Sequence, residues 1–360
     1  MGEIDEFYKL IDRGREGNSA GLSLGLPKLE KYIEGLTPTT SYLIGAGSGV
    51  GKTTFIIYSF IYCPIMEDDK SKDVHFLYFS LEMTPAQILA KLISIYLYLH
   101  EGVSLSFADI FSRSKDQNGE AIILSDDNYE LIKTCRPILE KFMDRITFVT
   151  GTLNAAKYVS EVSKYLKRFG EFNGDKYIPD NPNQILGIVV DHLNLVRASQ
   201  GKSKKEEIDL ISTYSVSFRN KCTIVSPINV MQLNRNANGQ ERLKQGLQEP
   251  DDSDLKETGS VFEDSMIALL LFNPVRAKLM THRGYDIKQL GSNYRSIKCI
   301  KNRFGAADIA VGCAFYGEIG VFKELPKSSE LTNYMKYQTP DWILLDDYEP
   351  TSVGKTKIKL

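Results

Sequence analysis

Residues 42–54 read YLIGAGSGVGKTT, a short apolar run that passes into a glycine-rich loop ending in lysine and threonine. The run predicts a buried strand, and the residues after the loop predict a helix. Gly47, Gly49 and Gly51 allow the backbone to turn its N–H groups inward, and the helix N-terminus adds a field that favours anions. This order is typical of a P-loop, with Ala46 in place of the usual first glycine. The residues expected to line a phosphate site are Ala46, Gly47, Ser48, Gly49, Val50, Gly51, Lys52, Thr53 and Thr54.

The rest of the chain alternates apolar runs with helical patterns. Further strands are expected at 75–79, 146–149, 185–190 and 228–232. Capping residues at Thr84, Asn154 and Ser203 start helices between them, and the helix from Asn154 is expected to end at Gly170. This alternation predicts an α/β fold with a mostly parallel sheet flanked by helices. Four closely spaced strands follow, at 266–272, 295–300, 309–315 and 321–324, and we expect them to pair antiparallel at the C-terminal edge.

Composition narrows the class of protein. The chain has 360 residues, and 44 Lys and Arg balance 46 Asp and Glu, so no global positive field indicates a nucleic-acid or membrane partner. Any DNA contact must come from local loops. The five cysteines are scattered without a C-x-x-C pair, which favours a reducing compartment over a disulfide or zinc framework. No apolar stretch is long enough to span a bilayer, and we expect a cytoplasmic protein with no membrane partner.

Three polar residues lie at or just beyond the ends of predicted strands. A P-loop binds ATP through its lysine and Mg²⁺ through its threonine, here Lys52 and Thr53. Asp191 ends an apolar strand and is a candidate for organising the metal, although many strands end in a turn Asp. Glu82 is a candidate for orienting the attacking water, although a solvated glutamate at a helix start is the commoner case. Gln232 ends a further strand, where an amide can sense the γ-phosphate.

The ordered motifs AGSGVGKT, YFSLEM, IVVDHLNL, VMQLNR, PDDSDLKETGS and KNRFG resemble the RecA-like motor domain of the DnaB-type replicative helicases. The resemblance runs from about residue 21 to residue 325. Members of that family form six-membered rings that encircle single-stranded DNA and hydrolyse nucleotide at subunit interfaces. The resemblance implies that Glu82 is the catalytic carboxylate, that Asp191 organises Mg²⁺ and that Gln232 is the sensor. Lys301 and Arg303 match the family's basic pair, supplied to a neighbour's γ-phosphate; without the family, a solvated strand end would be preferred.

For DNA, the resemblance implies two loops that face a central channel. The first follows the 185–190 strand and carries four basic residues; for those at 202–205 a merely solvated loop is about as plausible. The second spans residues 234–259, far longer than an ordinary connection. The positions matching the family's DNA contacts are Arg197, Lys202, Lys204, Lys205, Lys256, Glu257 and Gly259.

The chain also departs from the family's pattern. The usual N-terminal domain is not recognisable, so the sequence resembles a stand-alone, phage-like motor. We expect a short amphipathic docking helix and linker at 1–20, the motor at 21–326 and an irregular tail at 327–360. The helix carries a stripe of Ile4, Phe7, Tyr8 and Ile11, which packs either on its own core or on a neighbouring subunit. A charged insertion at 274–293 separates two late strands.

The leading interpretation is an ATP-dependent, ring-forming DNA helicase, with a hexameric homo-oligomer, single-stranded DNA and a primase or helicase loader as expected partners. Two alternatives stay open. One is a recombination or repair ATPase that forms filaments on DNA, and the other is a nucleotide-binding regulatory subunit of a replication complex.

Overall fold

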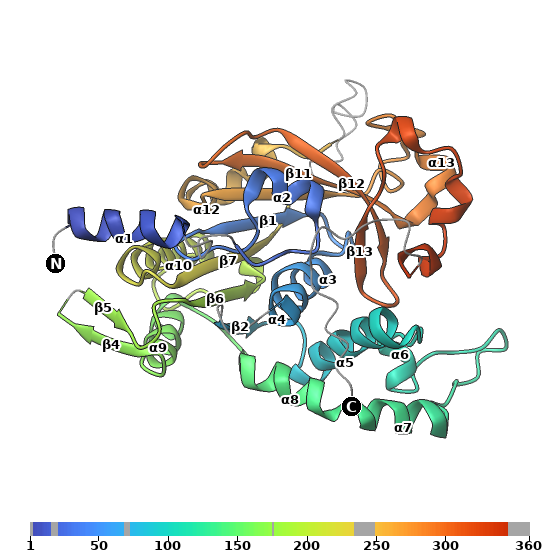
Figure 1. The fold of residues 1–360 in the computed structure, drawn as a ribbon, viewed down its shortest axis with the longest axis horizontal. Helices are drawn as coiled ribbons and strands as arrows, with labels where there is room; N and C mark the ends of the chain where they lie inside the picture. The colour runs from blue at the N-terminus through green and yellow to red at the C-terminus, as the bar shows by residue number, and fades with distance from the viewer. Residues whose placement is uncertain (1–2, 16–20, 68–72, 175, 234–248, 345–360) are drawn as a thin grey trace.

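The computed structural model describes residues 3–15, 21–67, 73–174, 176–233 and 249–344; within these ranges the side chains of residues 256–258 and of part of the first helix are not described. The centre of the molecule is a nine-stranded sheet in the order β13-β12-β11-β8-β1-β7-β6-β2-β3 (Figure 1). Its strands are β1 (Tyr42–Ala46), β2 (Asp73–Ser80), β3 (Ile146–Thr150), β6 (Gln184–Asp191), β7 (Val225–Gln232), β8 (Ile267–Phe272), β11 (Tyr294–Asn302), β12 (Ile309–Tyr316) and β13 (Val321–Glu324).

The predicted fold class is confirmed, with one correction to the strand pairing. The pairs from β8 through β1, β7, β6 and β2 to β3 are all parallel, while β11, β12 and β13 pair antiparallel at the C-terminal edge. We expected β8 to belong to the antiparallel group. Instead it lies between β1 and β11, parallel to the first and antiparallel to the second. All six residues of β8 are buried, which suits an interior strand covered on both faces.

Helices cover both faces of the sheet (Figure 1). The P-loop segment continues from α3 (Lys52–Phe55) through the π-helical turn η1 (Ile56–Tyr62) into α4 (Cys63–Glu67), and packs with α2 (Pro27–Ile33) and α5 (Pro85–Tyr96) on one face. The other face is covered by α9 (Ala155–Leu166), α10 (Lys204–Lys221) and α12 (Gly259–Asp264). We call these the P-loop face and the α10 face.

The predicted helix starts are confirmed in hydrogen-bonding detail. Thr84 and Gln87 form a reciprocal capping box at α5, and Ser203 and Glu206 form another at α10. Asn154 accepts a hydrogen bond from the Lys157 N–H at 2.9 Å and so caps α9. The expected end of α9 at Gly170 is wrong, because the helix stops at Leu166 and Gly170 begins a strand.

Several elements had no counterpart among the sequence predictions. A small lobe forms on the P-loop face from η2 (Leu97–Glu101), α6 (Phe107–Ile110), α7 (Asp126–Thr134) and α8 (Arg136–Arg145). The hairpin of β4 (Gly170–Asn173) and β5 (Lys176–Pro179) lies at the opposite end of the molecule from α7 in Figure 1. The insertion holds a second hairpin, β9 (Thr281–His282) and β10 (Tyr285–Asp286), followed by α13 (Ile287–Leu290) and the 3₁₀ turn η6 (Gly291–Asn293).

Short 3₁₀ turns account for most of the remaining regular structure. They are η3 (Leu193–Leu195), η5 (Asp252–Thr258), η7 (Ser328–Glu330), η8 (Tyr334–Tyr337) and η9 (Pro340–Ile343). After β13 the described chain contains only such turns, and its Trp342 is buried with its Nε1 donating to the Tyr316 hydroxyl. In the described ranges, no helix combines the length and the apolar composition that crossing a bilayer requires.

The first helix, α1 (Glu3–Arg15), has an apolar stripe that is exposed and not buried in the core of this chain. Ile4, Phe7 and Tyr8 are 71%, 58% and 59% exposed, and Ile11 is exposed as well. Of the two expectations for this stripe, packing on the chain's own core is therefore wrong.

Candidate nucleotide site

The P-loop connects β1 to α3 at the carboxyl edge of the parallel strands. Gly49 and Gly51 have φ angles of 65° and 114°, the left-handed region that a residue with a side chain rarely adopts. The Lys52 side chain folds back over the loop, and its Nζ donates to the Gly47 carbonyl at 3.1 Å. Burial lowers the pKa of Lys52, while the carboxylates of Asp191 and Glu82 oppose that shift. The lysine thus lies between a backbone oxygen and two acidic groups, all suited to holding an ammonium beside phosphates.

Two arginines that the sequence analysis did not single out support the P-loop. Arg295, at the start of β11, donates from Nε to the Val50 carbonyl at 2.8 Å and stacks over the Phe315 ring. Burial lowers the pKa of Arg295 to about 10, and the charge of Arg276 adds to the effect.

Arg276, from the insertion, donates to the Ser48 carbonyl. A Cβ on Gly49 would lie only 2.7 Å from its Nη2, so a side chain there would displace the guanidinium group. The two arginines thus donate to the carbonyl oxygens of two P-loop residues, Ser48 and Val50.

The end of β6 brings Asp191 to the start of the P-loop helix. The Thr53 hydroxyl donates to Asp191 Oδ1 at 3.3 Å, and the Tyr78 hydroxyl donates to Oδ2 at 2.8 Å. Asp191 is only 3% exposed, and burial raises its pKa, although the hydrogen bonds from Tyr78 and Thr53 oppose the rise. Structure therefore places the two predicted metal-site residues in direct contact.

A hydroxyl and a carboxylate oxygen are the hard ligands that Mg²⁺ prefers, and Mg²⁺ usually completes its shell with waters and substrate phosphates. Within the described ranges, no group of three or more His, Cys, Asp and Glu side chains could hold a metal ion. The pair formed by Thr53 and Asp191 thus fits a Mg²⁺ that is shared with a nucleotide, and no dedicated protein cage is present among those residues.

Glu82 lies just beyond β2 at the rim of the same site. Its side chain is 61% exposed, and its Oε2 is 3.9 Å from Nε2 of His192, the residue after Asp191. Leu81 donates its N–H to the Asp191 carbonyl at 3.1 Å, which fixes the turn that carries Glu82 beside the end of β6. The carboxylate is therefore close to the metal-site residues and accessible to water.

Gln232 ends β7, next to β1 in the sheet. Its backbone N–H donates to Asn194 Oδ1 at 2.7 Å, and Asn194 Nδ2 donates back to the Gln232 carbonyl at 3.4 Å. Its register partner on β1 is Ala46, the first residue of the P-loop. The predicted sensor is thus fixed at the level of the loop by its backbone, with the side chain half-buried.

Lys301 and Arg303 lie at the opposite end of the central strands from the P-loop. In the β8–β11 pairing Lys301 is opposite Ala268, while the P-loop residue Ala46 is level with Leu271 at the far end of β8. Three residues of strand correspond to about 10 Å. Lys301 Nζ donates to the Phe262 carbonyl at 2.6 Å, and Arg303 Nη2 donates to the Glu263 carbonyl at 3.1 Å, at the C-terminal end of α12. The pair is therefore held away from the P-loop of its own chain.

The predicted DNA-binding residues divide into two groups. Arg197, Lys202, Lys204 and Lys205 are exposed, on the segment between η3 and the first turn of α10. Gly259 begins α12. Lys256 and Glu257 lie on η5, but their side chains, like residues 234–248 of the second loop, lie outside the described part of the structure.

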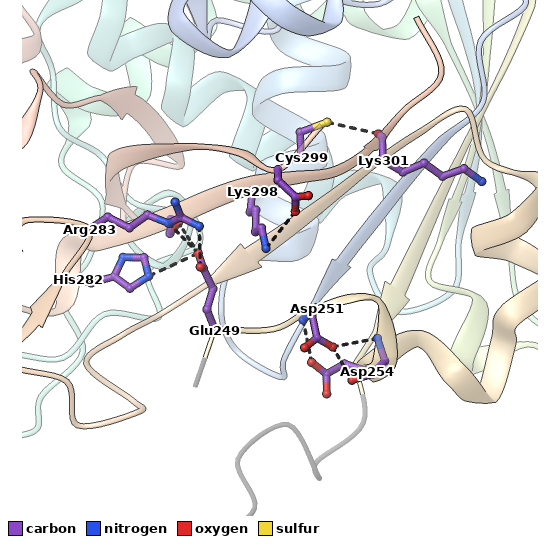
Figure 2. Close-up of polar contacts among 11 residues, drawn as sticks. Glu249, Asp251, Asp254, His282, Arg283, Lys298, Cys299 and Lys301 are labelled. Atoms are coloured by element: carbon purple, nitrogen blue, oxygen red, sulfur yellow. Dashed lines mark hydrogen bonds and ion pairs between the residues drawn. The ribbon is translucent and has the colours of Figure 1, made fainter. Parts of the chain in front are cut away.

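Glu249, the first described residue of that loop, is held by a cluster that the sequence did not reveal (Figure 2). Arg283 donates to it from Nε at 3.1 Å and from Nη2 at 2.7 Å, and His282 Nε2 lies 3.4 Å away. Ser296 on β11 donates a further bond at 3.2 Å. Burial alone would raise the pKa of Glu249, but the bonds from His282 and Arg283 outweigh it and lower the pKa to about 2.

Fold and site together define a RecA-like P-loop nucleotide-binding protein. The family model for the DnaB-like helicase C-terminal domain matches residues 21–108 and 175–324, so the chain belongs to that family. It is 27% identical over 304 residues to the replicative DNA helicase DnaB of Buchnera aphidicola subsp. Baizongia pistaciae (strain Bp), a match covering 84% of this chain and 53% of that protein. The chain thus spans about half the length of this curated relative.

Two solved structures share the fold. A solved ATPase domain superposes with a TM-score of 0.65 at 22% identity, covering 91% of this chain and all of that one. A DnaB-like replicative helicase, described with its interactions with primase, gives a TM-score of 0.65 at 21% identity and covers 90% of this chain and 69% of the other.

Proposed function

We propose that this protein is an ATP-driven DNA helicase motor that completes its nucleotide sites between neighbouring subunits of a ring. The observation that carries the proposal is the position of Lys301 and Arg303, at the sheet edge opposite their own P-loop. Cations there cannot serve the phosphates bound in the same chain. They are suited to a nucleotide held by a neighbour, which makes hydrolysis depend on assembly.

Within one chain, the P-loop amides and Lys52 would hold the β- and γ-phosphates of ATP. Thr53 and Asp191 would hold Mg²⁺, which when bound neutralises charge that develops on the phosphates. Glu82, exposed at the rim beside Asp191, would orient the attacking water and accept its proton. Gln232 would report the state of the γ-phosphate to the segments on either side of it.

The basic residues around the start of α10 support a channel that tracks the phosphate backbone. Arg197, Lys202 and Lys204 are exposed. Single-stranded DNA is the partner that we propose for this surface, with contacts that depend on charge more than on base identity.

We also propose a division of the chain into a docking helix, a motor and a tail. Residues 21–326 would form the motor, and 1–20 a docking helix with its linker. The exposed stripe of α1 supports docking on an adjacent subunit, since Phe7 and Tyr8 contact each other edge to face and each leaves more than half of its side chain exposed. The tail at 327–360 is assigned no role in hydrolysis. Residues 21–326 include every residue that we place in the nucleotide site. A primase or a helicase loader would be a further partner of the motor.

The test is ATP turnover with and without single-stranded DNA over a range of protein concentrations, followed by unwinding of a forked duplex with ATP and Mg²⁺. We expect DNA to stimulate turnover and the activity per subunit to rise cooperatively with concentration. Open filaments on DNA without unwinding would instead support the recombination ATPase. Less than one turnover per subunit under every condition would support the regulatory subunit.

A further inference from the structure

Tyr78 is a residue of β2 whose side chain contacts the carboxylate of Asp191, the acid that we place in the metal site. Its hydroxyl donates to Asp191 Oδ2 at 2.8 Å. Both residues are buried, with exposed fractions of 0% and 3%. In the β2–β6 register Tyr78 is opposite Val189, and Ser80 is opposite Asp191. Because side chains alternate along a strand, Tyr78 and Asp191 are diagonal neighbours on the same face, the P-loop face.

The two oxygens of Asp191 therefore have different partners. Oδ1 faces Thr53, the residue that would share the metal, and Oδ2 faces Tyr78, which has no place in the nucleotide site. Because one oxygen is fixed in this way, the buried carboxylate cannot rotate about its Cβ–Cγ bond without losing the hydrogen bond from Tyr78.

We propose that Tyr78 is a positioning residue that holds Asp191 so that Oδ1 stays directed at the Mg²⁺ site beside Thr53. The inference rests on the metal role proposed above for Asp191. Tyr78 acts through Asp191 and touches neither nucleotide nor metal. If Mg²⁺ were bound, the Thr53 hydroxyl oxygen and Asp191 would hold it, and the hydrogen bond from Tyr78 would keep the other oxygen of Asp191 in place. Loss of a hydrogen bond that orients a metal-binding side chain typically changes metal affinity 10–100-fold.

The variant Tyr78→Phe removes one oxygen atom and leaves the buried ring. Binding of a fluorescent, non-hydrolysable ATP analogue is titrated with Mg²⁺, and separately measured in EDTA. We expect the Mg²⁺ concentration at half-maximal binding to rise about 10-fold or more, with the metal-free affinity unchanged. The matched control is Tyr158→Phe, which removes a buried hydroxyl paired with Ser215 Oγ at 2.7 Å on the α10 face. It should change neither quantity.

A double-mutant cycle with Asp191→Asn separates positioning from general damage to the fold. If Tyr78 acts through Asp191, the double variant has the same Mg²⁺ dependence as Asp191→Asn alone. Additive losses, or a loss of metal-free nucleotide affinity in Tyr78→Phe, would overturn the inference. So would an unchanged Mg²⁺ titration of Tyr78→Phe, while the metal site itself would stand. A wild-type protein whose nucleotide binding ignores Mg²⁺ would overturn both the inference and the proposed site.

Discussion

Lys301 Nζ lies 2.6 Å from the carbonyl oxygen of Phe262, at the end of α12 and far from the P-loop of the same chain. The contact holds a cation at a helix C-terminus, where the helix dipole favours positive charge. Burial lowers the pKa of Lys301, and the nearby Arg303 lowers it further. The two cations are thus held together at the end of the strands opposite the P-loop, too far away to contact a nucleotide bound in the same chain.

The first prediction concerns Arg303. Replacing it by alanine should leave nucleotide binding nearly intact and lower turnover roughly thousand-fold, as loss of an arginine finger does. Mixing Arg303→Ala with Glu82→Ala protein should restore part of the activity, because some interfaces then combine an intact arginine with an intact glutamate. Steady-state ATPase assays on mixtures check this. Mixtures no more active than their components would remove the support for sites shared between subunits.

Lys52→Ala should reduce ATP turnover at least a hundred-fold, because it removes the ammonium that lies over the P-loop and would neutralise charge on the β- and γ-phosphates. The matched control is Lys157→Ala. Its ammonium also donates to backbone carbonyls, those of Thr150 and Thr152 at 3.1 and 3.0 Å, but outside the site. Turnover is measured at saturating ATP. If the two variants lost activity equally, the P-loop assignment would be wrong.

Arg295→Met should destabilise the protein by about 3 kcal/mol, because it leaves buried carbonyls without their donor, Val50 among them. Nucleotide affinity should fall with it, since Val50 belongs to the P-loop. Urea unfolding and nucleotide titration measure the two effects. The exposed Arg113, which stacks over Phe111 at 5.3 Å, offers a control whose change to methionine should cost under about 0.5 kcal/mol. Equal costs at both positions would contradict the bracing role.

Glu249→Gln should weaken the fold in a pH-dependent way. The pKa of Glu249 falls from 4.5 to about 2 on folding, so its carboxylate stabilises the native state above pH 4.5 and progressively less as the pH approaches 2. Allowing for solvent screening of a partly exposed pair, the contribution at pH 7 is about 2 kcal/mol. Urea unfolding at pH 7 and at pH 3 should therefore show a gap between wild type and variant that narrows in acid. The exposed Glu318→Gln should show no such gap, and a gap independent of pH would be inconsistent with the ion pair.

Removing both Lys204 and Lys205 should weaken binding to single-stranded DNA of any sequence. If each contacts one phosphate, the slope of log affinity against log salt should fall by about 1.4. Fluorescence anisotropy at several salt concentrations measures it, with Lys133→Ala on α7 as a control that leaves the slope unchanged. Loss of affinity for one base sequence only would point to base readout and away from backbone tracking.

Features that depend on neighbouring residues in the chain could be predicted from the sequence, whereas features that depend on contacts between distant residues could not. The glycine loop, the capping boxes and the apolar strands are local patterns, and each appears in the structure at nearly the expected residues. The position of β8 was missed because spacing along the chain does not reveal which strand a strand will pair with. Roles for the site residues stay predictions, although the structure brings Lys52, Thr53 and Asp191 together.

The contacts around the P-loop were beyond the reach of local patterns. Arg276 and Arg295 meet Ser48 and Val50 across 228 and 245 residues of chain. Only the strand order, with β11 beside β8 and β8 beside β1, brings them near the loop. Tyr78 offered one weak signal, a hydroxyl within the apolar part of a strand, but its partner depends on the register of β2 with β6.

The β8–β11 pairing slips by one residue between Cys299 and Lys301, which leaves Ile300 as an extra residue. Cys299 belongs to the P-loop face, whereas Ile300 packs on the α10 face and Lys301 reaches Phe262 on that same side. Two successive side chains thus share one side, and the odd–even count of the strand changes at this point. Counting onward from Cys299 without the slip would send Lys301 and Arg303 to the P-loop face of the sheet. A single unpaired residue therefore decides on which side of the sheet both cations emerge.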